Sequence, residues 1–133
     1  MHSQTRRGFL ASLGAIVLAP SLLRAERGGP HPTPRTWASS ARIATDAQLA
    51  TKKEAIPTFV QAREIPAILD GIRCQCACTD GKAYYSLLSC FELPDMMAVD
   101  CQVCQAQARL AHRLHGAGKT LVEIRAGIDA KFG

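Results

Sequence analysis

The sequence predicts a small all-α fold: a helical bundle with a cysteine-rich loop packed against a helical hairpin. Two observations favour this class. In residues 98–118 and 119–133, apolar residues recur at the spacing of an amphipathic helix. No segment alternates apolar and polar residues as a half-buried strand does. Proline and glycine divide the remaining chain into short segments and so set the expected boundaries.

Residues 1–25 have the layout of an export signal, in which a pair of arginines precedes a mildly apolar run and small residues follow. The run is too short for a stable membrane span, and we expect cleavage after Ala25 or Ala19. The stretch TRRGFLA resembles the twin-arginine export motif. That resemblance implies the twin-arginine export machinery as a partner and a bacterial periplasmic or otherwise exported location. A chance arginine pair before a general secretory signal, or an uncleaved anchor, is the alternative.

The basic charge of the chain does not indicate a nucleic-acid partner. The formal net charge is +5, but residues 1–25 hold three of the 16 basic residues and none of the 11 acidic ones, so the rest carries only +2. Its arginines are scattered and form no stripe with aromatic residues, as a nucleic-acid surface would require. We therefore expect no nucleic-acid binding.

Residues 26–40 are rich in glycine, proline and serine and predict a flexible or extended linker that includes His31. The cysteine-rich helical domain follows at residues 41–133. Its first expected helix, 41–55, has Thr45 or Asp46 as a possible N-cap, and Pro57 is expected to end it.

Pro66 fits the first turn of a short helix at 65–70, and Gly71 is its natural C-cap. The cysteine loop, 72–81, comes next. A helix at 82–93 is then expected to end at Pro94 and to turn three residues toward the core: Leu87, Leu88 and Phe91.

The helix at 98–118 is the clearest, and glycines end it. Its apolar residues recur at helical spacing: Val99, Val103, Ala106, Leu110 and Leu114. In the last helix, Thr120 is the expected cap, and one face carries Leu121, Ile124 and Ile128.

Six cysteines follow the pattern C-x-C-x-C, eleven residues, C, ten residues, C-x-x-C: Cys74, Cys76, Cys78, Cys90, Cys101 and Cys104. Cys101 and Cys104 are spaced to share one face of a helix. A hairpin turn at 94–98 brings Cys90 toward them, and the loop cysteines can fold over the same end. We expect all six thiols to converge.

Converging thiols admit several chemistries. Thiolates select monovalent copper, zinc or an iron–sulfur cluster. A disulfide framework is the alternative, supported by the expected export and the even cysteine count. Dithiol exchange through Cys101 and Cys104 is conceivable because a helix start lowers a thiol pKa. We favour a metal, because the three loop cysteines are too crowded to pair with one another.

Neighbouring residues bear on the metal. Met96 and Met97 carry thioethers, which suit monovalent copper and are poor zinc ligands, although they equally suit gap-filling in a core. His112 and His115 are weaker ligand candidates. An enzyme is not expected, because a cysteine nucleophile needs a positioned base and the chain has no phosphate loop or paired-carboxylate motif.

From about Arg63 to Gly133, the chain resembles exported bacterial proteins named for a PCYCGC motif. The resemblance rests on four stretches: EIPAILDGIRCQCAC, SLLSCFE, DCQVCQAQARLAHRL and GKTLVEIRAGIDAKFG. It implies an exported metal-binding protein, with a ligand role for all six cysteines. No lipobox cysteine precedes Cys74, so a soluble periplasmic protein is expected.

The departures from that family matter for the metal. Three residues differ from the Pro, Tyr and Gly of the motif: Arg73, Gln75 and Ala77. Tyr84 and Met97 stand roughly where many members carry histidines. These changes weaken zinc and favour copper.

The sequence thus favours a carrier, store or chaperone of monovalent copper, whose downstream protein partner it does not identify. An iron–sulfur or dithiol electron-transfer component, a structural zinc domain and a disulfide-stapled interaction module are the alternatives.

Overall fold

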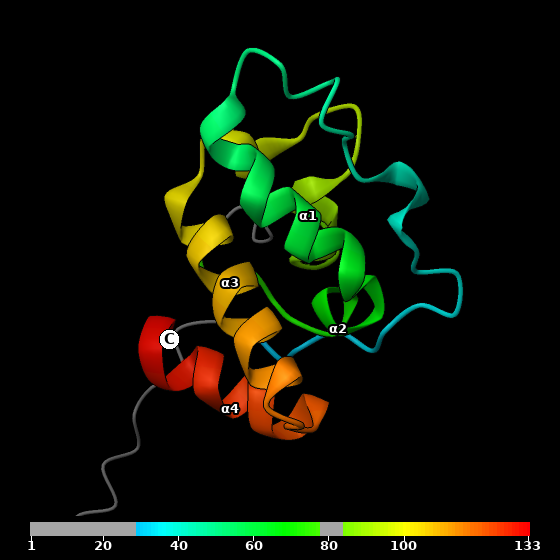
Figure 1. The fold of residues 1–133 in the computed structure, drawn as a ribbon. Helices are drawn as coiled ribbons and strands as arrows, with labels where there is room; N and C mark the ends of the chain where they lie inside the picture. The colour runs from blue at the N-terminus through cyan, green and yellow to red at the C-terminus, as the bar shows by residue number, and fades with distance from the viewer. Residues whose placement is uncertain (1–28, 78–83) are drawn as a thin grey trace, which may run out of the picture.

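The computed structural model describes residues 29–77 and 84–133 and has the predicted all-α architecture (Figure 1). The described residues contain no strand, only an isolated antiparallel bridge between Ile43 and Glu92. In chain order the elements are the 3₁₀-helices η1 (Ser40–Arg42) and η2 (Lys53–Ala55), α1 (Ile56–Glu64), α2 (Pro66–Asp70), the 3₁₀-helices η3 (Leu88–Phe91) and η4 (Met97–Val99), α3 (Gln102–Gly116) and α4 (Leu121–Phe132).

Helix α3 is the centre of the domain, because it packs against both α1 and α4 (Figure 1). The buried aromatic residues of the described core are Phe59 and Phe91, whose rings meet edge to face at 4.8 Å. The same core contains fully buried aliphatic side chains: Leu69, Leu87, Leu88, Ile124 and Ile128. No helix in the described part of the chain combines the length and apolarity that crossing a membrane requires.

The helix expected at 41–55 is wrong. Residues 46–51 form turns, and only the short η2 precedes α1, which begins at Ile56. Pro57 therefore lies at the start of a helix instead of ending one. A proline in the first turn loses no intrahelical hydrogen bond, since the N–H it lacks has no partner there.

The expected helix at 82–93 is replaced, over its described part, by the single 3₁₀ element η3. Backbone hydrogen bonds to other segments explain the difference. The Leu87 N–H donates to the carbonyl of Ile72 at 2.7 Å, and the Leu93 N–H donates to that of Arg42 at 2.8 Å. These donors are not available to a continuous helix. The predicted core residues are nevertheless buried: Leu87, Leu88 and Phe91.

The later helices are closer to expectation. Pro66 begins α2, Gly71 is its C-cap, and Thr120 caps α4. Helix α3 begins at Gln102, later than expected, because η4 occupies 97–99. Leu110 is buried as predicted, but Val103 is 39% exposed, so the buried face of α3 differs in part from the predicted one. The buried residues of α3 are Cys104, Gln105, Gln107, Ala108, Leu110 and Ala111.

Residues 29–39, assigned from composition to a linker, contact the helical domain. The Arg35 guanidinium pairs with the buried Asp70 carboxylate at 2.5 Å, and the Arg35 backbone N–H donates to the same carboxylate at 2.7 Å. Ser86 also donates to Asp70, at 2.7 Å. Burial opposes ionisation of Asp70, but the hydrogen bonds from Arg35 and Ser86 outweigh it and lower the pKa of this carboxyl. The expected export signal, its cleavage site and residues 26–28 lie outside the described residues.

Candidate metal centre

Five of the six cysteines converge beside the first turn of α3. The Sγ atom of Cys104 lies 3.2 Å from that of Cys74 and 3.4 Å from that of Cys76, and the Cys74 and Cys76 sulfurs are 3.2 Å apart. Cys90 and Cys101 complete the set, which we call the sulfur cluster. Cys78 lies outside the described residues.

The sulfur cluster contains two overlapping groups of three. In the first, the Sγ atoms of Cys74, Cys90 and Cys104 lie within 4.8 Å of one another, and all three residues are buried. In the second, those of Cys76, Cys101 and Cys104 lie within the same 4.8 Å, with Cys76 and Cys101 half-buried. Cys104 belongs to both groups.

Different elements supply these sulfurs. Cys74 and Cys76 follow α2 on an irregular segment, which turns at Ala77 with a left-handed φ of 67°. Cys90 lies on η3, so the expected approach of Cys90 to the C-x-x-C pair occurs from a short 3₁₀-helix. Cys101 is the N-cap of α3.

The start of α3 favours negative charge on the sulfurs. The Cys104 backbone N–H donates to the Cys101 Sγ at 3.4 Å, so a sulfur performs the capping that an oxygen usually performs. The unpaired N–H groups of a helix N-terminus carry partial positive charge and stabilise a thiolate. Cys101 therefore lies where a thiolate is electrostatically favoured.

The thiols share protons unevenly. Hydrogen bonds from Cys104 and then Cys90 lower the pKa of Cys74 against the opposing effect of burial. The contact with Cys74 raises the pKa of Cys104, and Cys90 and burial raise it further. A thiolate is thus more favoured at Cys74 than at Cys104. A bound cation would take the place of the thiol protons.

No disulfide joins the described cysteines to one another. Their closest sulfurs are 3.2 Å apart, well beyond the S–S bond of about 2.05 Å. Thiolates bound to one ion at about 2.3 Å are about 3.8–4.0 Å apart, so small side-chain rotations would suit the sulfur cluster to a metal. Among the described residues, neither three-sulfur group includes a histidine or a carboxylate.

The other candidate ligands have different contacts. His112 Nε2 pairs with Glu64 at 2.5 Å, and neither His112 nor His115 joins a sulfur group in the described part of the chain. Met96 packs against the hydrophobic core, as a gap-filling methionine would. Among the described residues, the sulfur cluster therefore consists of cysteines alone, and it is compatible with the binding of a metal ion.

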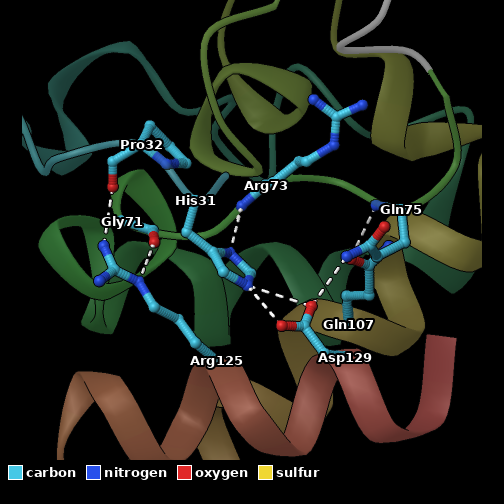
Figure 2. Close-up of polar contacts among 8 residues, drawn as sticks. All are labelled: His31, Pro32, Gly71, Arg73, Gln75, Gln107, Arg125 and Asp129. Carbon is cyan, nitrogen blue, oxygen red and sulfur yellow. Dashed lines mark hydrogen bonds and ion pairs between the residues drawn. The ribbon is translucent and has the colours of Figure 1, made fainter. Parts of the chain in front are cut away.

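A set of hydrogen bonds, which we call the polar brace, holds the segment 71–75 against α3, α4 and the N-terminal segment (Figure 2). The Gln75 backbone N–H donates to Gln107 Oε1 at 3.0 Å, and the Gln75 side-chain amide donates to Asp129 on α4 at 2.9 Å. Arg125 donates to the Gly71 carbonyl at 2.7 Å. Even the capping residue of α2 is thus fixed to α4.

His31 closes the polar brace. The Arg73 backbone N–H donates to its Nδ1 at 3.0 Å, so the proton of the neutral ring is on Nε2, which donates to Asp129 at 3.0 Å (Figure 2). Pro32 beside it accepts from Arg125 at 2.7 Å. The N-terminal segment therefore lies against the residues that carry the first two cysteines.

Gln107 joins the polar brace to the sulfur cluster. Its side chain is fully buried, and its Nε2 donates to Cys74 Sγ at 3.5 Å and to the Val103 carbonyl at 3.2 Å. Sequence reasoning did not single out Gln107. The available signal is its position, three residues after Cys104 and so on the same helix face.

A comparison of the chain with protein-family models, curated proteins and solved structures finds no match. The resemblance to the PCYCGC-motif proteins therefore stays a prediction.

Proposed function

We propose that this protein binds monovalent copper through clustered cysteine thiolates and acts as a carrier, store or chaperone of that ion. The convergence of five sulfurs within two groups, each spanning no more than 4.8 Å, is the observation that carries the proposal. Thiolates are soft ligands and select soft ions such as monovalent copper.

The number of ligands favours copper over zinc. Each group offers three mutually adjacent thiolates, and monovalent copper readily takes three, whereas a structural zinc ion takes four. The absence of acid–base residues from both groups, within the described chain, supports transport or storage over catalysis. The twin-arginine-like leader and the resemblance to PCYCGC-motif proteins support an exported, periplasmic location.

The test is a metal titration under reducing, oxygen-free conditions. The chain is purified anaerobically, its free thiols and labile sulfide are measured, and monovalent copper is added in competition with a copper-specific chelator. Divalent zinc is titrated in parallel. We expect copper to bind more tightly than zinc, with release of protons from the thiols.

Matched variants identify the ligands. Cys76→Ser should lower copper affinity at least tenfold, because it removes a sulfur from the cluster, whereas His112→Ala should leave the affinity unchanged. Equal affinity in both variants would remove the loop cysteines from the site. Iron with labile sulfide would instead indicate an electron-transfer cluster. Three disulfides without metal would indicate a stapled interaction module.

A further inference from the structure

Cys104 is central to the sulfur cluster. Cys104 is adjacent to all four other described cysteines, since it belongs to both three-sulfur groups. Cys74 and Cys76, one from each group, are themselves 3.2 Å apart. The two groups are therefore two faces of one continuous cluster that meet at the Cys104 sulfur.

One soft ion cannot use all these sulfurs. A three-coordinate ion at Cys74, Cys90 and Cys104 would leave the other two described sulfurs unused, although they lie within 4.8 Å of Cys104. A thiolate sulfur has more than one lone pair available and can bridge two soft cations. Cys104 is placed where such a bridge is needed.

We propose that the cluster binds two monovalent metal ions, which share the Cys104 thiolate as a bridge. The inner ion is held by Cys74, Cys90 and Cys104, and the outer ion by Cys76, Cys101 and Cys104. This inference rests on the proposed function, because it assigns a second site to the same sulfurs.

The charges balance with groups that the protein supplies. Five thiols release five protons to solvent and two monovalent ions enter, so the cluster retains three negative charges, and neither sulfur nor copper changes oxidation state. The helix start beside Cys101 and the Gln107 N–H that contacts Cys74 both stabilise negative sulfur. No added redox partner is required.

The two sites differ in access to solvent. All three inner cysteines are buried, whereas Cys76 and Cys101 of the outer group are half-buried. A competing chelator can approach the outer ion more easily. We therefore expect the outer ion to leave first and the inner ion to leave slowly.

The experiment counts ions per chain. Cys78→Ser is introduced into the full chain, so that only the five described cysteines remain. The reduced protein is loaded anaerobically with monovalent copper, and native mass spectrometry counts the bound ions. We expect two. Copper X-ray absorption should show a copper–copper scattering path, and chelator removal should occur in two phases.

Single serine variants in this background separate the sites. Cys101→Ser should bind one ion and lose the fast phase of removal, and Cys90→Ser should bind one ion and lose the slow phase. Cys104→Ser should bind fewer than one tight ion. Far-ultraviolet circular dichroism checks that each variant keeps its helices, and the copper–copper path in the parent tests the bridge without these variants.

The outcomes distinguish the two proposals. One ion per chain in the five-cysteine protein would overturn the second site and leave copper binding intact. Two ions in Cys104→Ser would overturn the bridge. No bound copper in any form would overturn the proposed function itself.

Discussion

The sulfur cluster and the polar brace both contact the same short segment of chain, residues 71–76, and their bonding differs. The polar brace consists of hydrogen bonds of ordinary length. The Gln75 side-chain amide donates to Asp129 at 2.9 Å, and the Arg73 backbone N–H donates to His31 at 3.0 Å. In the sulfur cluster, the thiols contact one another at 3.2–3.4 Å. Thiols are weak donors and weak acceptors.

Because of this difference, the stability of the fold and the binding of metal should depend on different contacts of the segment. The polar brace forms complete hydrogen bonds without any ligand, so it should stabilise the metal-free fold. The sulfur cluster gains much more from a cation than from its own protons. We therefore expect changes in the polar brace, or in the ion pair of Arg35 with Asp70, to alter the free energy of unfolding. Changes in the sulfurs should alter metal binding.

The largest expected loss of stability comes from Asp70→Ala. This carboxylate is fully buried, and its removal leaves the Arg35 guanidinium, itself only 20% exposed, without its partner. Breaking such a pair costs about 3–5 kcal/mol. Urea unfolding of the reduced, metal-free protein measures it. A loss below about 1 kcal/mol would mean that solvent replaces the carboxylate without penalty.

Gln107→Ala should have the next largest effect and should reach both regions. It removes the acceptor of the Gln75 N–H in a buried site, which costs about 1–3 kcal/mol of unfolding free energy. It also removes the N–H that donates to Cys74, so copper dissociation should accelerate severalfold.

Gln105→Ala is the matched control for that experiment. Gln105 is also buried on α3, but it donates to the carbonyls of Ala98 at 2.8 Å and Val99 at 3.1 Å and not to sulfur. It should lose comparable stability with no change in copper dissociation. Equal dissociation rates in the two variants would argue against tuning of the sulfur by Gln107.

The smallest effect is the acid dependence of stability. Because Arg35 and Ser86 lower the pKa of Asp70 in the folded state, its contribution is complete above the unfolded value of about 3.9. It is lost as the pH falls below that value through the lower folded pKa. Asp70→Asn should flatten this part of the stability profile. An unchanged acid limb would assign the acid sensitivity to other carboxyls.

The sequence predicted the features that depend on local chemistry. The all-α class, the Gly71 and Thr120 caps and the positions of α3 and α4 follow from periodicity and capping residues. The approach of Cys90 to Cys104 followed from chain connectivity. Whether these sulfurs are metal ligands, and for which metal, stays a prediction.

The features that sequence reasoning missed depend on distant contacts. The helix expected at 82–93 fails where the Leu93 N–H bonds to Arg42, a partner that no local pattern reveals. The polar brace uses glutamine, histidine and aspartate singly, without periodicity. His31 was assigned to a linker because composition does not show its pairing with Asp129.

The pairing of His31 with Asp129 spans 98 positions of the chain. Closing a flexible loop of that length costs about 4 kcal/mol of chain entropy, more than the roughly 1 kcal/mol that a part-buried hydrogen bond returns. The contact therefore cannot form by itself. It depends on the ion pair of Arg35 with Asp70 and the bond from Arg125 to Pro32, which shorten the loop that remains to be closed. The N-terminal segment should consequently bind and detach as one cooperative unit.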